Sequence, residues 1–360
     1  MTPARRVLVL VLTILGVIFV VVAALVPTRL RQMAVQIPVD FEKQTVLAGT
    51  GDLLDRSSIY KDGPLQVGTG LPLAITATTE ATEVTTSGDL GVRTTSIGTK
   101  VGVPEALAEF HSAIDLITID RRERTVVSSP EPTMQAPATT PAEATPARVG
   151  TYFTFPAGTP REDLPYFDTA THTPVTVRYM DDDRTVEGLG ALHFRFEVIG
   201  HDMAESPAVG QPTRLTLPAA KWGLPGADPV TMNLYYTMMQ DIWVEPVTGT
   251  VIDSALQPKS YFGRDPQDPQ QVVVYAGSLR FTPETVTSLS NTARDGKDTI
   301  RLIFFWLPIG LAIVGVALLV AAVLLTVRGR RRAGAADTRQ ATETAPEAGD
   351  EKPTPVGSGR

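Results

Sequence analysis

Two apolar segments without a charged side chain, residues 7–26 and 302–327, constrain this chain more than any other feature. An α-helix rises about 1.5 Å per residue and the hydrocarbon core of a bilayer is about 30 Å thick, so about 20 residues cross it. Both segments reach that length. The sequence therefore predicts two transmembrane helices, whose end residues are Val7, Val26, Leu302 and Val327.

Arginines next to the predicted spans indicate the orientation, because short cytoplasmic flanks carry an excess of Lys and Arg. The strongest cluster follows the second span and consists of Arg328, Arg330, Arg331 and Arg332. The first span has arginines on both sides, namely Arg5, Arg6, Arg29 and Arg31. We therefore expect a two-pass plasma-membrane protein with both termini in the cytoplasm. A cleaved signal peptide is the alternative for the first span, although its apolar stretch exceeds the usual h-region of about 7–15 residues.

These boundaries divide the chain into five predicted parts with different charge. They are a cytoplasmic N-terminus (1–6), the first span (7–26), an extracytoplasmic β-rich domain (27–301), the second span (302–327) and a disordered cytoplasmic tail (328–360). The net charge of the chain is −7. The two arginines before the first span contribute +2, and the tail, with 7 basic and 5 acidic residues, contributes another +2. The domain between the spans therefore carries −7 − 4 = −11. Such a charge repels nucleic acid, and the absence of cysteine excludes disulfides and Cys-ligated metal.

The domain is predicted to be mostly β (α+β) and antiparallel, because its runs of Thr, Val, Ile and Tyr are separated by Gly, Pro and Asp. In "HFRFEV", Phe194, Phe196 and Val198 fall on one face, as a half-buried strand requires. Two stretches look helical: residues 104–114, and a stalk at 283–300 that is weakened at Gly296. The Pro-rich residues 129–148 read as a loop, across which we expect one sheet to close.

The stretch "DIWVEPVTGTVID" predicts a β-hairpin. Two apolar runs flank residues 246–249, and Gly249 supplies the positive φ of the turn. We expect Trp243 to be packed and Glu245 to lie at the turn. The hairpin is therefore predicted to have a structural role.

Candidate metal and catalytic groups are few. Three adjacent acids, Asp181, Asp182 and Asp183, lack the spacing of a calcium loop and are predicted to form a solvated turn. A bend at Gly200 would bring His193 and His201 together with Asp202, but His193 on the polar face of a strand needs no ligand. No G-x-S-x-G motif is present. We therefore predict a non-enzymatic protein without a cofactor or a metal site.

Aromatic residues are the more suggestive feature of the domain. Phe155, Tyr235 and Trp243 are our candidate ligand-binding residues, since clustered aromatics line apolar cavities. The competing interpretation is that they fill the core of a β domain. Trp222 stands in a loop-like stretch, where an exposed indole would indicate a lipid or partner contact.

Three stretches occur one after another between the two spans: "YFTFPAGTPREDLPYFD", "VEGLGALHFRFEV" and "DIWVEPVTGTVID". In these, and in its layout, the chain resembles the actinobacterial porin PorA family, membrane proteins long catalogued as a domain of unknown function. The resemblance covers nearly the whole chain except the Pro-rich loop and the tail. It implies a membrane location and a shared fold, and it supplies no catalytic residues.

Three kinds of function remain for such a chain. A porin barrel requires strands with an outward apolar band, whereas this sequence has two helical spans with Thr13 and Thr326 as their polar residues. We therefore predict that the protein binds or passes a lipid or glycolipid during envelope biogenesis. The alternatives are a porin or channel component, and a scaffold or sensor for envelope glycosyltransferases. Expected partners are membrane lipids or glycolipids and envelope-synthesis membrane proteins, with no nucleic acid.

Overall fold

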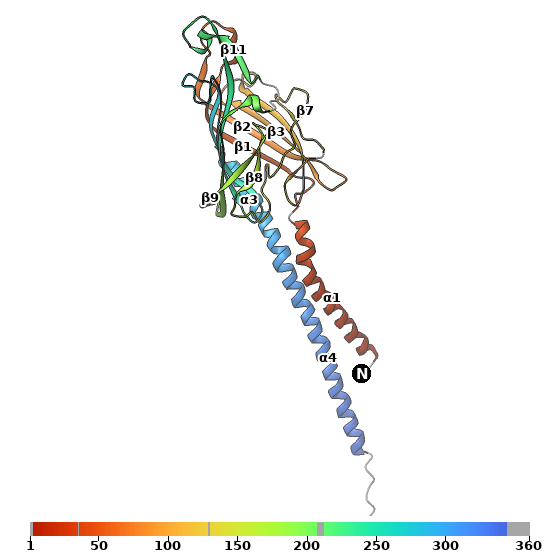
Figure 1. Cartoon of the computed structure of the whole chain (residues 1–360). Coiled ribbons are helices and arrows are strands. Elements are labelled where there is room, and N and C mark those ends of the chain that lie inside the picture. The colour runs from red at the N-terminus through yellow and green to blue at the C-terminus, as the bar shows by residue number, and fades with distance from the viewer. Residues whose placement is uncertain (1–2, 35, 129, 207–211, 344–360) are drawn as a thin grey trace, which may run out of the picture. The chain divides into compact units, whose positions relative to one another are not determined.

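Long antiparallel strands and two long apolar helices account for most of the chain in the computed structural model, which describes residues 3–34, 36–128, 130–206 and 212–343. The predicted fold class is confirmed. The chain divides into a helical unit, drawn from residues 1–31 and 301–360, and a β unit, residues 32–300. Figure 1 labels several of their elements.

Fourteen strands of the described chain form one sheet in the β unit. Their hydrogen-bonded order is β7-β6-β4-β3-β2-β1-β14-β13-β12-β10-β9-β8, with β5 beside β4 and β11 beside β12. Their bounds are β1 (Glu42–Leu54), β2 (Val67–Val84), β3 (Leu90–Lys100), β4 (Glu109–Ile119), β5 (Val126–Val127), β6 (Thr133–Gln135), β7 (Glu143–Ala144), β8 (Leu164–Asp168), β9 (Thr173–Val186), β10 (Leu189–Asp202), β11 (Arg214–Pro218), β12 (Pro229–Glu245), β13 (Thr250–Gly263) and β14 (Val272–Phe281).

The sheet closes on itself through a short segment that follows the Pro-rich loop. The backbone N–H of Val126 in β5 donates to the carbonyl of Gly150 (3.2 Å). The next residue, Thr151, forms a parallel bridge with Tyr166 in β8. Because β5 pairs with β4, the hydrogen-bonded order returns from β8 to β4. Closure of this kind removes the long unpaired edges that an open sheet would expose.

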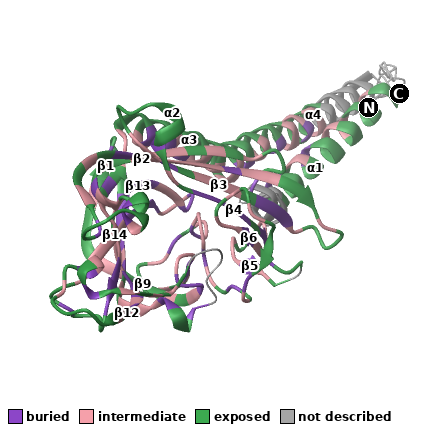
Figure 2. Cartoon of the chain, turned by 90° about the horizontal axis from the view of Figure 1, so that it is seen from above, coloured by how far each residue is buried: buried purple, intermediate pink, exposed green. Residues whose placement is uncertain are grey.

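Apolar side chains alternate along the strands and fill much of the interior of this closed sheet. One cluster joins Phe194 and Phe196 of β10 to Ile242 of β12 and to Phe155. A second is built around Trp222, Met232 and Phe262, and a third contains Leu90, Val92 and Ile117 of β3 and β4. Figure 2 shows buried and intermediate residues along β3, β4 and β14. The period-2 alternation predicted for β10 is what places these side chains inside.

Helix α3 (Pro283–Arg301) packs on the outer face of the sheet. Thr282 starts it, because its hydroxyl accepts from the N–H of Thr285 and its carbonyl from that of Val286. Leu289 and Ala293 then contact Trp243 and Ile252. The helix agrees with the predicted stalk and continues through Gly296 without a break.

Three sequence-based expectations differ from the structure. The helix expected at 104–114 is wrong: α2 (Glu105–Ala108) is a single turn, and the Ile-rich residues after it pair with β3 as β4. The acidic residues 181–183 lie inside β9, not in a turn. Of the tail predicted to be disordered, residues up to Glu343 continue the last helix, since Ala and Arg favour helix, and 344–360 lie outside the described residues.

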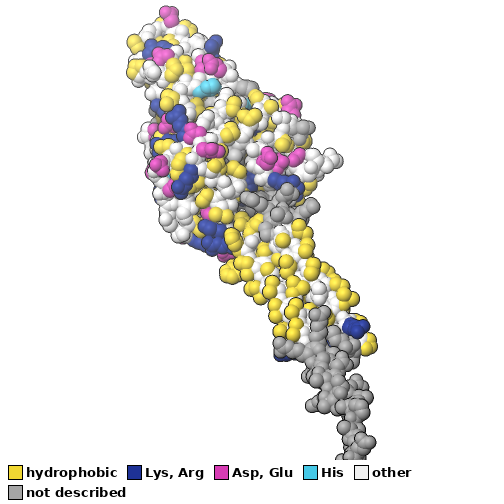
Figure 3. Space-filling view, turned by 60° about the horizontal axis from the view of Figure 1, so that its bottom comes forward, with side chains coloured by type: hydrophobic (Ala, Val, Ile, Leu, Met, Phe, Trp, Pro, Cys, Tyr) yellow, Lys and Arg dark blue, Asp and Glu magenta, His cyan; other side chains and the backbone are white. Residues whose placement is uncertain are grey.

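The helical unit contains the two predicted spans, and both are long and apolar enough to cross a membrane. The first lies in α1 (Pro3–Ala34), which holds Val7 and Val26. The second begins at a π-helical turn, η4 (Leu302–Trp306), and continues as α4 (Leu307–Glu343), which holds Val327. Hydrophobic side chains cover the described surface of these helices in Figure 3. The remaining short helices are η1 (Arg56–Tyr60), η2 (Met203–Glu205) and η3 (Ala219–Trp222).

Two glycines allow α1 and α4 to approach each other closely. A Cβ on Gly16 would lie 2.8 Å from Leu319 Cγ, and one on Gly315 would lie 2.8 Å from Val20 Cγ2. Near one end of the pair, the Arg5 guanidinium donates to the carbonyl of Leu325 (2.6 Å). Small residues at such contacts let van der Waals packing hold helices together in lipid.

Replacing Gly315 with Ile should therefore separate the two helices. The chain has no native cysteine, so spin labels on L10C and V320C report the α1–α4 distance by pulsed electron resonance. We expect a longer and broader distance distribution in the variant. Gly310→Ile is the control, because a Cβ at Gly310 meets nothing within 4 Å. An unchanged distribution in G315I would contradict the packing described here.

Candidate functional site

A chamber of about 760 Å³ lies inside the closed sheet. Strands from opposite sides of the interior contribute its apolar wall, so no single stretch of sequence defines it. That wall includes Leu47, Leu71, Ile75, Leu234, Met238 and Leu256. Its volume is within the range of small-molecule pockets.

The polar wall of the chamber is carried mainly by β3 and β4. Ser96 and His111 face each other across these strands, with Ser96 Oγ 3.1 Å from His111 Nε2. Burial lowers the pKa of His111. Among the described residues no carboxylate hydrogen-bonds the other ring nitrogen, so the pair lacks the orienting group that a hydrolytic triad uses.

A buried ion pair adjoins this wall, and its carboxylate residue, Asp115, lines the chamber. Arg148 Nη1 and Nη2 each donate to one oxygen of Asp115 at 2.6 Å, and the Arg148 side chain is 0% exposed. The guanidinium also lies 4.9 Å from the centre of the Phe167 ring. Burial, and next the Asp115 charge, raise the pKa of Tyr152 well above its usual value. The pair ties the end of the Pro-rich loop to β4.

Two aromatic rings meet at the chamber beside a strand glycine. Phe110 and Tyr275 lie 5.4 Å apart, centre to centre, and both line the chamber. A Cβ at Gly98 would lie 2.7 Å from Phe110 Cζ, so the glycine makes room for that ring. The Tyr275 hydroxyl is buried, and within the described chain it has no hydrogen-bond partner. Burial raises the pKa of Tyr275.

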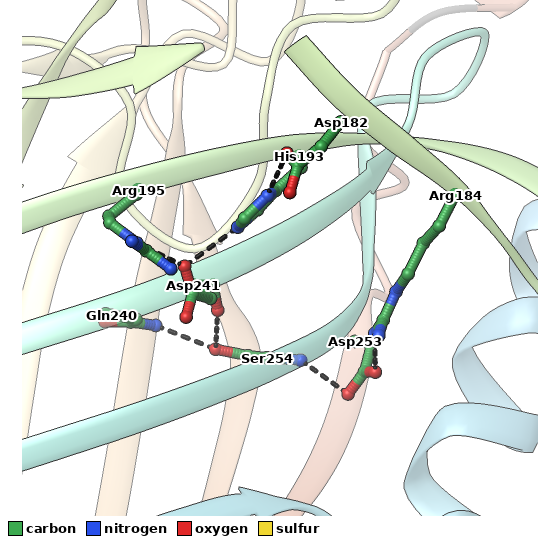
Figure 4. Close-up of polar contacts among 8 residues, drawn as sticks. All are labelled: Asp182, Arg184, His193, Arg195, Gln240, Asp241, Asp253 and Ser254. Carbon is green, nitrogen blue, oxygen red and sulfur yellow. Dashed lines mark hydrogen bonds and ion pairs between the residues drawn. The ribbon is translucent and has the colours of Figure 1, made fainter. Parts of the chain in front are cut away.

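A second polar cluster surrounds Trp243 on the outer face of the sheet. The His193 ring stacks on the indole at 4.8 Å between centres. Its Nδ1 lies 2.6 Å from Asp182 and its Nε2 lies 2.8 Å from Asp241. Figure 4 shows the two carboxylates at opposite ends of the ring. Each ring nitrogen therefore lies within hydrogen-bonding distance of a carboxylate.

Two arginines complete this cluster around the indole. Arg184 and Arg280 both pair with Asp253, whose side chain is 3% exposed. The Arg184 guanidinium lies 3.6 Å from the centre of the Trp243 ring, a cation–π contact. Together with α3, these contacts fix Trp243 in place.

The Asp241 carboxylate gives this cluster a pH dependence. Burial alone would raise its pKa, but hydrogen bonds from Arg195 (2.6 Å) and His193 outweigh burial and lower it. A lowered folded-state pKa means stability that is present above the unfolded value of about 3.9 and lost as pH falls below it. We expect Arg195→Met to cost about 1–3 kcal/mol at pH 7 and to flatten the loss of stability between pH 5 and pH 3. Urea unfolding at several pH values measures both, and parallel pH profiles would contradict the assignment.

Comparisons with known proteins assign the chain to a family. The family model described as Porin PorA matches residues 8–324. The chain belongs to the porin PorA family. A Porin PorA of Corynebacterium amycolatum is 24% identical over 331 residues, covering 79% of this chain and 85% of that protein. A Porin PorA of Corynebacterium resistens is 22% identical over 280 residues, covering 61% of this chain and 68% of that protein.

Membership of the porin PorA family overturns one expectation. The predicted role in binding or passing a lipid or glycolipid during envelope biogenesis is wrong, because the matched family and both relatives are named porins. The physical reason for the error is that aromatic content was taken as a sign of lipid binding, and aromatics also fill β cores. The porin or channel alternative is the one that the family supports.

The three candidate ligand residues lie apart in this PorA-family chain. Phe155 is in the interior core and contacts Phe194 at 5.0 Å between ring centres. Tyr235 contacts Tyr261 at 5.8 Å, and Trp243 belongs to the cluster under α3. The chamber wall contains none of the three. Their shared site remains a prediction, and the structure places each among packing partners.

Other residues singled out in the sequence also have structural partners. His201 Nε2 lies 2.7 Å from Ser206 Oγ, and Asp202 accepts from the N–H of Ala204 as the cap of η2. Trp222 is buried and donates to the carbonyl of Val230 (2.9 Å). Among the described residues, no group of three or more His, Asp or Glu side chains is arranged to hold a metal ion.

Sequence reasoning missed the interior polar groups. Asp115 and Arg148 are 33 positions apart, and one of them sits at the end of a Pro-rich stretch that reads as a loop. Ser96 looks like an ordinary strand residue, and His111 falls in the stretch 104–114 that was expected to be helical. The signal that was available is the phase of the alternation, since Thr94, Ser96 and Asp115 occupy positions that apolar residues take elsewhere in the same strands.

Proposed function

We propose that this membrane protein is a pore-forming component of the cell envelope, in which the chamber of the β unit is part of the solute path. The observation that carries the proposal is the match of the porin PorA family over residues 8–324. The chamber of about 760 Å³ supports it, because it offers a small solute both apolar and hydrogen-bonding contacts.

The proposed topology is a two-pass arrangement in the plasma membrane. The Arg-rich flank after the second span favours a cytoplasmic C-terminus, and Arg5 and Arg6 favour the same side for the N-terminus. The β unit is then extracytoplasmic. Because each span is almost wholly apolar, we propose that a bilayer pore requires several copies of the helix pair.

The proposed role is non-enzymatic and uses no cofactor. The Ser96–His111 pair, without an orienting carboxylate, is proposed to serve as polar wall. Membrane lipids around the helices and envelope membrane proteins are the proposed partners. Nucleic acid is not, since the segment between the spans is acidic.

Planar-bilayer recording of the purified full-length protein tests this proposal. We expect stepwise conductance. Ser96→Trp, which places an indole in the chamber, is expected to reduce the unitary conductance roughly by half or more, because pore-lining bulk restricts the path. Ile97→Trp is the matched control: it is the next residue of β3 and points outward, where Ile97 is 41% exposed.

Two results would overturn the proposal at different points. Silence from folded, reconstituted protein would exclude a pore formed by this chain alone. Stepwise conductance that S96W and I97W leave equally unchanged would exclude the chamber from the path.

A further inference from the structure

Lys43 lies on the interior face of the closed sheet. Leu47, four residues later in β1, lines the chamber, and residues four apart in a strand point to the same side. The pairing of β1 with β2 is regular from Glu42 to Gly51, so no bulge reverses this phase. The neighbouring acids Glu42 and Glu80 pair with each other one position away, on the outer face, where Glu42 is exposed and Glu80 half-buried.

A continuous polar row runs from Lys43 across four strands. Lys43 pairs with Thr79, Thr79 with Thr94, and Thr94 with Asp115. With about 4.8 Å between strands, the row extends for about 14 Å. The hydroxyls of Thr79 and Thr94 lie 3.2 Å apart, and Thr94 lines the chamber. The row therefore leads from Lys43 to the chamber wall.

No acid in this row neutralises Lys43. Asp115, the carboxylate of the row, already accepts from Arg148 with both of its oxygens. Within the described chain, no hydrogen bond or ion pair is found for the Lys43 ammonium, in contrast to Lys297, which pairs with Glu245. Burial lowers the pKa of Lys43 to about 8, so most of the population is charged at neutral pH. Lys43 is half-buried, and its ammonium is not fully enclosed by the described protein. A partly desolvated cation without a protein partner marks a candidate functional site.

We propose that Lys43 binds an oxyanion, the carboxylate or phosphate group of a solute that occupies the interior of the β unit. The ammonium supplies the charge, and the Thr94 hydroxyl at the chamber wall donates a hydrogen bond. The Thr79 hydroxyl extends the same polar row. The site goes beyond the proposed pore, because an oxyanion can be bound whether or not the chain conducts.

Carbon-13 NMR of reductively methylated, full-length protein in detergent micelles tests the site, since methylation keeps the lysine charge. Lys43→Arg assigns the Lys43 signal. Sodium phosphate and sodium acetate are added separately at constant ionic strength, with sodium chloride as the reference salt. We expect the Lys43 signal to shift and saturate, while that of Lys61, whose side chain is 63% exposed, does not. Saturation by phosphate alone, by acetate alone or by both assigns the site to phosphates, to carboxylates or to the oxyanion that they share.

Two variants test the residues themselves. Thr94→Val is expected to weaken binding about tenfold, because a charge-assisted hydrogen bond is lost. Thr95→Val, on the outward face of the same strand, is the matched control. Lys43→Met should retain the fold with a higher melting temperature, because it removes a partly desolvated charge that has no partner in the described chain. A lower melting temperature in K43M would overturn the proposal, since it would mean that Lys43 has a stabilising partner within the chain.

The outcomes of these experiments distinguish a failure of the oxyanion site from a failure of the proposed pore. Equal, non-saturating shifts at Lys43 and Lys61 would be a general salt effect and would overturn the oxyanion site, even for a conducting protein. Saturable binding by a protein that is silent in planar bilayers would retain the site and overturn the pore.

Discussion

Arg148→Met is expected to destabilise the protein by about 3–5 kcal/mol, because it leaves the buried Asp115 carboxylate without its partner. Arg148 is fully buried and donates to both Asp115 oxygens at 2.6 Å. It also donates to Thr145 Oγ1 at 3.2 Å. Met retains much of the side-chain volume, so the expected loss comes from the uncompensated charge and not from a large cavity. Urea unfolding of the full-length protein in detergent, followed by circular dichroism, measures it.

The double variant Arg148→Met/Asp115→Leu is the control for this interpretation. Replacing both partners with apolar residues removes the unpaired charge, and buried ion pairs replaced in this way are often neutral for stability. We expect the double variant to recover most of the loss. If R148M alone costs less than about 1 kcal/mol, the value typical of exposed pairs, the ion pair is not sealed from solvent as described.

Gly150→Ala is the second substitution with a large expected effect, because Gly150 closes the sheet. Its φ is +85°, and a Cβ would lie 2.3 Å from the carbonyl oxygen of Pro165. The positive φ alone costs an L-residue about 1–3 kcal/mol. The clash is with backbone that a rotamer change cannot move, so the segment must leave β8. We expect loss of the Thr151–Tyr166 bridge and faster amide exchange in β5 and β8.

Gly158→Ala separates the cost of the positive φ from the effect of the steric clash. Gly158 also has a positive φ, +76°, but a Cβ there meets nothing within 4 Å. It should therefore show the conformational cost without opening the sheet. Hydrogen exchange with mass spectrometry distinguishes the two variants. Equal protection of β5 and β8 in G150A and G158A would show that the sheet does not depend on this closure.

Local sequence patterns predicted the large features well. The alternation in "HFRFEV" correctly placed Phe194 and Phe196 on an apolar face, and the turn of the 241–253 hairpin falls at residues 246–249 with Gly249 at φ +69°. Both depend on the preferences of neighbouring residues. The prediction for residues 104–114 failed because helical spacing of three apolar side chains is weaker than pairing with a neighbouring strand, and β4 pairs along its length with β3.

The candidate site could not be predicted in the same way. His193 was placed on the polar face of its strand, and that face is buried because Asp182, Asp241 and Trp243 cover it. These residues come from three strands, and only their register brings them together. Aromatic content did not distinguish a cavity wall from packed core, because both use the same side chains.

The sequence by itself determined that this protein has two apolar helices, an antiparallel β unit between them and a place in the porin PorA family. The helices and the β unit follow from hydrophobic length and residue periodicity, which act over a few turns or strand residues, whereas the family follows from the resemblance of three stretches and the match over residues 8–324. The tertiary structure alone decided that the sheet closes through Gly150 and Thr151, that Asp115 meets Arg148, and that Lys43 lies at the end of an interior polar row. Each of these depends on strand register and on closure between segments far apart in the chain, and local preferences do not encode either one.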